Sequence, residues 1–202
     1  MASPDPASVT LAILAGGAGS RMGLPKSHLE IHGQPILQYL LQQFRWTGPT
    51  LLVTSPGRQN PPAASFFDRE VSDPIPDQGP LRGLLTALEH STTPMVIACT
   101  TDMPLVRSMH LHWLLDQFSS HSQSLGLMIQ PQAGRIEPFP SLFHTSAAYP
   151  IAQQLQQSRR SVHGLARISH FTILPAPAEW GSTVWTNLNN RKDLQEFLGQ
   201  VN

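Results

Sequence analysis

The sequence predicts a single α/β domain with a mostly parallel central sheet and helices on both faces. Short apolar runs rich in β-branched residues alternate along the chain with segments whose apolar residues recur at helical spacing. Such alternation is typical of strand–helix–strand units, which build parallel sheets covered on both faces. The length of 202 residues suits one such domain, which buries about 70% of the surface of its unfolded chain. Ligands of such sheets bind beyond the carboxyl ends of the strands.

The strands and helices can be assigned expected positions along the whole chain. A strand at 9–14 leads into a glycine-rich loop, and the helix at 35–44 begins with Pro35, whose fixed φ suits a first helical turn. Further strands are expected at 50–54, 70–73, 94–100, 125–130 and 171–174, with an extended pair over 135–143. Further helices are expected at 81–89, 108–118, 146–157, 162–168 and 191–199. Because the later elements interrupt the alternation, we expect a mixed sheet. The small, proline-rich residues 1–8 are expected to be a disordered lead-in to a domain over 9–202.

Charge and cysteine content narrow the function classes. Thirteen basic and thirteen acidic residues cancel, which disfavours a nucleic-acid surface held by net charge. The single cysteine, Cys99, cannot form an intramolecular disulfide, and no leader of charged and then apolar residues opens the chain. We therefore expect a cytoplasmic protein. No apolar run approaches the roughly 20 residues that span a bilayer, so no membrane partner is expected.

The segment ILAGGAGSRMGLPK over 13–26 predicts a phosphate-binding loop. Its glycines allow backbone N–H groups to approach an anion closely, and Arg21 and Lys26 supply cations. A P-loop would need a Gly-Lys pair, and a dinucleotide-binding fingerprint would need glycine where Met22 stands. The remaining alternative is an ordinary glycine-rich turn with solvated cations.

A carboxylate, Asp102, directly follows the apolar strand at 94–100 and therefore lies where α/β sites gather. Mg²⁺ is usually bound by one or two carboxylates together with substrate phosphates, so Asp102 is the expected metal ligand. The alternative is an Asx turn in which Asp102 bonds only its own backbone. From this segment alone the Asx turn is favoured, and the metal is favoured only through the family resemblance described next.

These segments together resemble the small nucleotidyltransferases, and most closely the molybdenum cofactor guanylyltransferase family. The resemblance is carried by four segments: 13–26, 73–84 (DPIPDQGPLRGL), 100–104 (TTDMP) and 185–194 (WTNLNNRKDL). It implies a Rossmann-like nucleotidyltransferase fold, with the nucleotide in the N-terminal half and the acceptor in the C-terminal half. It also implies transfer of GMP from Mg-GTP to molybdopterin with release of pyrophosphate, and cofactor-delivery proteins or molybdoenzymes as possible partners.

The resemblance implies roles for particular residues. The catalytic residues are Arg21, Lys26 and Asp102, with Asp102 also holding the metal. The nucleotide-binding residues are Leu14, Ala15, Gly16, Gly17, Lys26, Thr54, Asp73, Gly79 and Asp102. The acceptor-binding residues are Arg135, Asn187 and Asn189.

Several of these roles have alternatives. Asn187 and Asn189 are equally suited to completing a Mg²⁺ shell, and Asn189 or Asn190 to capping the last helix. Asp77 could substitute for Asp73 in contacting the nucleotide. Arg82 stands where the family more often has alanine, and we expect it to face solvent.

The LAGG form of the loop is similar to that of the guanylyl branch of the family, so the resemblance implies GTP rather than CTP as the nucleotide. Cytidylyl transfer to molybdopterin, nucleotidyl transfer to a sugar or alcohol phosphate, and a non-catalytic nucleotide-binding regulator are the alternative functions.

Overall fold

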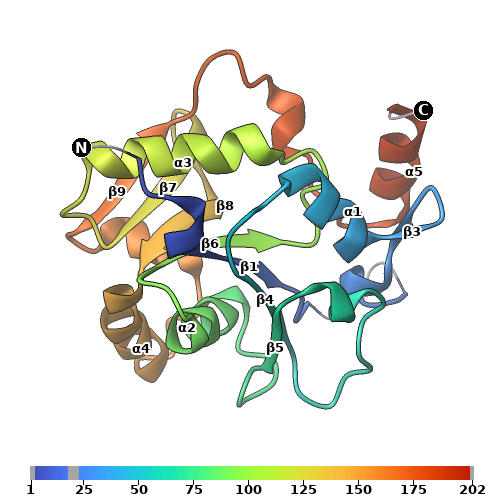
Figure 1. The fold of residues 1–202 in the computed structure, drawn as a ribbon, viewed down its shortest axis with the longest axis horizontal. Coiled ribbons are helices and arrows are strands. Elements are labelled where there is room, and N and C mark those ends of the chain that lie inside the picture. The colour runs from blue at the N-terminus through green and yellow to red at the C-terminus, as the bar shows by residue number, and fades with distance from the viewer. Residues whose placement is uncertain (1–2, 18–22, 201–202) are drawn as a thin grey trace.

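One seven-stranded sheet forms the centre of the computed structural model, which describes residues 3–17 and 23–200. The strands lie in the order β5, β4, β1, β6, β8, β7, β9 (Figure 1). Their bounds are Val9–Leu14 (β1), Thr50–Thr54 (β4), Arg69–Ser72 (β5), Met95–Thr100 (β6), Gly126–Gln132 (β7), Arg135–His144 (β8) and Phe171–Pro175 (β9). All neighbouring strands in this sheet run parallel except at β8, which is antiparallel to both β6 and β7. The predicted mostly parallel but mixed sheet is confirmed.

Helices cover both faces of this sheet. Their bounds are Ile36–Phe44 (α1), Pro80–His90 (α2), Ser108–Ser120 (α3), Ala148–Gln156 (α4) and Arg191–Gln200 (α5). The helices α1 and α3 lie on one face, and α2 and α4 on the other (Figure 1). The segment expected to be an α-helix at 162–168 is instead a 3-10 helix over Val162–Arg167. A short hairpin, β2 (Glu30–Ile31) with β3 (Gln34–Pro35), was not predicted, because two-residue strands leave no periodicity to detect.

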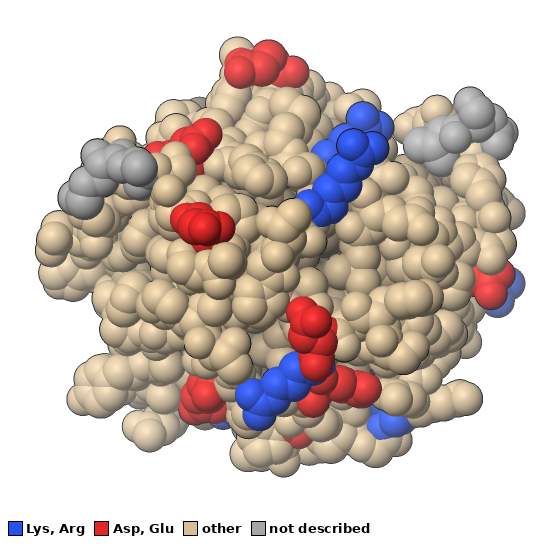
Figure 2. Space-filling view, in the orientation of Figure 1, with Lys and Arg blue, Asp and Glu red and all other residues tan. Residues whose placement is uncertain are grey.

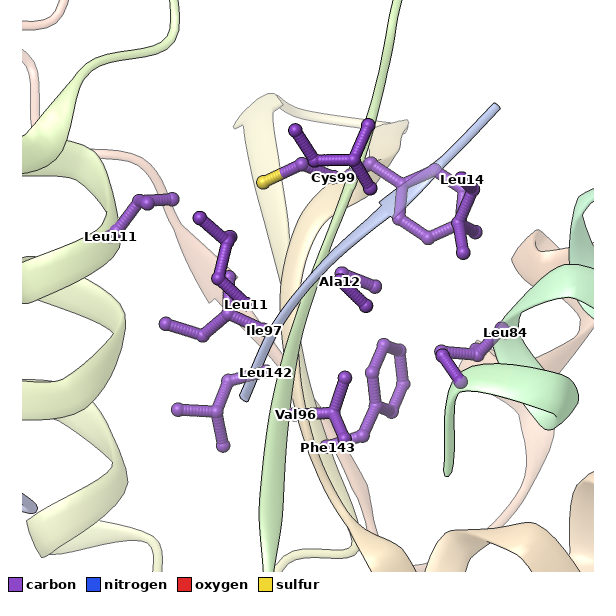
Figure 3. Packing of buried hydrophobic residues seen from close by; sticks show 14 of the residues in the cluster. Leu11, Ala12, Leu14, Leu84, Val96, Ile97, Cys99, Leu111, Leu142 and Phe143 are labelled. Carbon is purple, nitrogen blue, oxygen red and sulfur yellow. The ribbon is translucent and has the colours of Figure 1, made fainter. Parts of the chain in front are cut away.

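The apolar runs of the central strands are explained by burial on both faces. Figure 3 shows Leu111 of α3 and Leu84 of α2 approaching the sheet from opposite sides. Successive strand residues alternate between them, as Leu11 and Ala12 do on β1. Cys99 belongs to this core, and burial raises the pKa of its thiol. This environment suits a packing residue and disfavours a thiolate nucleophile.

The strand register fixes where the loops emerge. Leu14 pairs with Val53 on one side and with Thr100 on the other, and Thr54 pairs with Ser72. The chain therefore leaves β1, β4, β5 and β6 at one edge of the sheet. This edge includes the point between β1 and β6 where the strand order reverses, which is where open α/β sheets bind ligands.

The described residues before β1 include one short helical segment. Residues Pro6–Ser8 form one turn of 3-10 helix, and the Asp5 carboxylate accepts the Ala7 N–H at 2.9 Å as its N-terminal cap.

On the face shown in Figure 2, basic and acidic side chains lie in small separate groups among uncharged residues. Within the described ranges, none of the helices has both the length and the apolar character needed to cross a bilayer.

Candidate active site

A cavity of about 570 Å³ lies at this sheet edge. Its lining comes from the glycine loop after β1, from the chain after β4, β5 and β6, from the start of α2, and from β8 and the segment before α5. The lining residues are Leu14, Gly16, Gly17, Lys26, Val53, Ser55, Asp73, Asp77, Gln78, Gly79, Pro80, Gly83, Thr100, Thr101, Asp102, Met103, Glu137, Pro138, Phe139 and Asn187.

A lysine and a carboxylate meet at one end of this cavity. Lys26 Nζ lies 2.7 Å from Asp102 Oδ2 and 2.9 Å from Asn189 Oδ1, and it donates to both oxygens. The other carboxylate oxygen, Asp102 Oδ1, accepts the Thr100 hydroxyl at 2.6 Å. The side chains of Lys26 and Asp102 keep 18% and 21% of their exposure, so incoming phosphate groups can reach them.

The segment before α5 is fastened to this pair through its backbone. The Leu188 N–H donates to the Asp102 carbonyl at 2.8 Å. Asn190 is the helix cap, because its Oδ1 accepts the N–H groups of Lys192 and Asp193. Asp193 Oδ2 in turn accepts the N–H groups of Asn189 and Asn190, at 2.7 and 3.1 Å. The capping role therefore belongs to Asn190, which leaves the Asn189 side chain to contact Lys26.

Asp73 lines the same cavity from the loop after β5, which β4 and β1 separate from β6 and Asp102, and it is 7% exposed. Its Oδ1 accepts the Thr86 hydroxyl of α2 at 2.6 Å. Burial raises the pKa of the Asp73 carboxyl, against the Thr86 hydrogen bond and the Arg82 charge, which lower it. Gly79, at φ 77° and ψ −178°, turns the chain into α2 in a conformation open almost only to glycine.

The expectation that Arg82 faces solvent is wrong. Its side chain is 13% exposed, pairs with Glu89 at 2.9 Å, and donates from Nε to the Thr86 hydroxyl at 3.4 Å. The helix α2 lies against the sheet, so a long side chain in its first turn is enclosed by its own helix surface.

Most of the predicted nucleotide-binding residues line this one cavity: Leu14, Gly16, Gly17, Lys26, Asp73, Gly79 and Asp102. Ala15 and Thr54 do not. Ala15 is buried, and the Thr54 hydroxyl lies 3.3 Å from the Val71 carbonyl of the neighbouring strand. Because side chains alternate along a strand, Ser55 reaches the cavity in place of Thr54. Arg21 lies outside the described residues.

The predicted acceptor residues line a second cavity of about 400 Å³, which shares Asn187 with the first. Arg135 and Asn189 belong to this second cavity only. Arg135 donates from Nε and Nη2 to Glu137 Oε1, at 2.9 and 2.6 Å. Glu137 is 8% exposed and lines the first cavity, so this pair connects the two.

Sequence reasoning missed Ser55, Glu137 and Phe139. Ser55 follows a strand end directly, and that position was a usable signal. Glu137 and Phe139 lie inside β8, and alternation along a strand does not say which face borders a cavity.

The donor groups fit a hard divalent cation that takes further ligands from phosphates and water. Asp102 supplies one carboxylate, and the nearby amides of Asn187 and Asn189 supply neutral oxygens. Among the described residues, no three His, Cys, Asp or Glu side chains are gathered as a metal site. A protein-only metal cage is therefore not what these residues form.

Comparison with known proteins places this chain in a family. The protein-family model described as "MobA-like NTP transferase domain" matches residues 11–170 of this chain. A probable molybdenum cofactor guanylyltransferase of Methanosarcina acetivorans is 30% identical over 203 residues, covering 94% of this chain and 89% of the relative. The molybdenum cofactor guanylyltransferase of Vibrio cholerae is 26% identical, covering 96% of this chain and 93% of the relative.

Solved structures show the same fold. The molybdopterin-guanine dinucleotide biosynthesis protein A of Archaeoglobus fulgidus superimposes with a TM-score of 0.78 at 20% identity, covering 95% of this chain and 97% of that one. A 2-C-methyl-D-erythritol 4-phosphate cytidylyltransferase of Thermus thermophilus gives 0.68 at 17% identity, covering 94% and 98%. Because the family model spans most of the chain and the fold agrees, this protein belongs to the MobA-like NTP transferase family and is a nucleotidyltransferase.

Proposed function

We propose that this enzyme transfers GMP from GTP to molybdopterin. An oxygen of the terminal phosphate of molybdopterin attacks the α-phosphorus of GTP, a new P–O bond forms, and pyrophosphate leaves with the electrons of the broken bond. The guanylyltransferase names of the relatives support this choice of substrates. The proposed setting is the cytoplasm, with cofactor-delivery proteins or molybdoenzymes as partners.

The observation that carries the proposal is the meeting of Lys26, Asp102 and Asn189 beside the glycine loop. These residues come from three distant segments, and a merely structural turn needs none of them. In the proposed mechanism the Lys26 ammonium exchanges its present acceptors for phosphate oxygens of the nucleotide. Arg21 and the loop amides share the neutralisation of the leaving pyrophosphate.

Asp102 would hold Mg²⁺, with Asn187 or Asn189 as a neutral ligand. When bound, the ion supplies charge neutralisation at the nucleotide phosphates. The enzyme's own residues position the two substrates, and in-line positioning supplies on the order of 7–11 kcal/mol of the barrier reduction. No covalent enzyme intermediate is needed, in agreement with the buried Cys99.

In the same cavity, Asp73 is the proposed contact for hydrogen-bond donors of the nucleotide. The glycines at 16, 17, 79 and 83 would let the backbone approach the nucleotide closely. The second cavity, with Arg135 and Asn187, is the proposed acceptor site.

A thermal-shift titration with GTP, CTP, ATP and UTP, each with and without Mg²⁺, tests the proposal. A ligand at about 100 times its Kd adds roughly 2.7 kcal/mol, which raises the Tm of a domain this size by several degrees. We expect selective stabilisation by GTP that Mg²⁺ strengthens, and pyrophosphate release once molybdopterin is added. Selectivity for CTP would move the enzyme to cytidylyl transfer, and GTP binding without pyrophosphate release would indicate a regulator.

A further inference from the structure

Thr86 is a fully buried hydroxyl residue on the inner face of α2. A threonine within a helix commonly bonds back to the carbonyl of the preceding turn. Here the hydroxyl instead reaches a different element, because Oγ1 lies 2.6 Å from Asp73 Oδ1, just beyond β5. The bond therefore connects α2 to a carboxylate in the wall of the first cavity.

The direction of this hydrogen bond follows from its partners. An ionised carboxylate can only accept, so the Thr86 hydroxyl donates to Asp73. Arg82 Nε, at 3.4 Å, donates to the same Thr86 oxygen. Glu89 holds Arg82 from the other side at 2.9 Å, so four side chains form a chain from the surface of α2 to the cavity.

The two oxygens of Asp73 consequently have different surroundings. Oδ1 is engaged by Thr86. Oδ2 lies 3.8 Å from the position that a Cβ atom would occupy at either Gly16 or Gly83, and both of these glycines line the cavity. At that distance a Cβ atom would only be in ordinary van der Waals contact with Oδ2, so this oxygen lies beside the glycine backbone that borders the cavity.

We propose, on the basis of the proposed function, that Thr86 is a positioning residue for the nucleotide. By holding Oδ1, it fixes the Asp73 carboxylate so that Oδ2 is the oxygen presented to nucleotide N–H or O–H donors. The four-residue chain that ends at Asp73 thereby sets the affinity of the enzyme for its nucleotide.

Ionisation of Asp73 gives this role a distinctive signature. A carboxylate accepts donors with both oxygens only when it is ionised, so nucleotide affinity falls as pH falls through its pKa. Burial raises that pKa and the Thr86 bond opposes the rise, so loss of the hydroxyl raises the pKa further. The charged group on α2 that acts on Asp73 is Arg82, which is paired with Glu89. Asp77, on the segment after β5, lines the same cavity and is paired at 3.5 Å with Arg58 of the segment after β4.

The experiment measures the Kd of Mg-GTP by calorimetry from pH 5 to pH 8 for the wild type, Thr86→Val and Thr86→Ser. Valine keeps the shape and removes the donor, so we expect a Kd about tenfold higher at pH 7 and a low-pH loss of affinity that begins at higher pH. Serine keeps the donor and should restore both properties toward wild type.

Thr10→Val is the matched control. Thr10 is also buried, and its hydroxyl bonds to Thr93 at 2.8 Å, but it lies outside the cavity lining. It should lower the Tm without changing Kd or its pH dependence.

Should Thr86→Val prove too unstable for calorimetry, Thr86→Ala is measured in its place with the same expectation. A wild-type Kd and pH profile in the valine or alanine variant would overturn the role of Thr86 while leaving the proposed function intact. Absence of nucleotide binding by the wild type would overturn both.

Discussion

Lys26 carries one ammonium group, and two protein oxygens already share it, at 2.7 and 2.9 Å. Nucleotide phosphates are stronger acceptors for this ammonium than the neutral Asn189 amide, because their oxygens carry negative charge. We therefore expect Lys26→Ala or Asp102→Ala to lower turnover about 10²- to 10³-fold, the usual cost of one preorganised charge partner. Pyrophosphate release measures this. Lys192→Ala, which removes an 82% exposed lysine, is the control, and near-wild-type turnover in either site variant would exclude the mechanism.

Arg135 and Glu137 allow a second test at the level of single residues. Removing the cation leaves a carboxylate that is 8% exposed without its partner, while Arg135 itself is half exposed. Arg135→Gln should therefore cost about 1–2 kcal/mol of unfolding free energy, less than a fully buried pair would. The Arg135→Gln/Glu137→Gln double variant should regain most of it in urea denaturation. If the single and double variants lost the same unfolding free energy, the pair would not act through charge.

At the scale of elements, the N-terminus of α5 serves both helix and site. Asp193 accepts two backbone N–H groups there, including that of Asn189, whose side chain contacts Lys26. We expect Asp193→Ala to cost about 1 kcal/mol of stability, because it removes the carboxylate that accepts the N–H of the capping residue Asn190, and to lower turnover as well. Gln195→Ala, on the exposed surface of the same helix, should change neither. Reduced stability with unchanged turnover would confine Asp193 to capping.

The elements that sequence predicts well are those with long, regular patterns. The strands β1, β4 and β6 lie within a residue of their expected bounds, because burial on both faces requires continuous apolar runs. The expected helix at 162–168 is a 3-10 helix, since a six-residue segment contains too few turns to distinguish a period of 3.0 from 3.6. The position of Glu137 depends on the pairing of β8 with β6 and β7, which local sequence does not encode.

At the scale of the whole molecule, acid stability should depend on His110. This histidine is 3% exposed, and its Nδ1 accepts the Arg107 N–H at 2.8 Å. Burial lowers its pKa below 6.5, against the backbone hydrogen bond with Arg107, which raises the pKa, and with the Arg107 charge, which lowers it. Below pH 6.5 the unfolded chain therefore binds a proton that the folded chain resists, and unfolding becomes more favourable as pH falls.

His110→Gln should weaken this pH dependence, because glutamine at the same helical position can still accept the Arg107 N–H but does not titrate. The measurement is the unfolding free energy from urea titrations between pH 5 and pH 8. His112→Gln, an exposed histidine on the same helix, is the control. An unchanged pH dependence in His110→Gln would assign acid sensitivity to other groups.

The candidate site was predictable where it follows strand ends and glycines, as at Gly16, Asp73 and Asp102. It was not predictable where side chains from other layers complete it. In the sequence, Thr86 is one more residue of a predicted helix. The bond of its hydroxyl to Asp73 depends on the packing of α2 against β5, which local sequence does not show.

The contacts of Lys26 join residues 76 and 163 positions apart in the chain. Pairings between such remote segments form late, because the entropy of closing the intervening chain must first be offset by other structure. The proposed catalytic arrangement is therefore a product of complete folding. Intermediates with an ordered β1–β6 core but an undocked C-terminal segment would lack the Asn189 contact. Activity in this enzyme consequently reports on the integrity of almost its entire length.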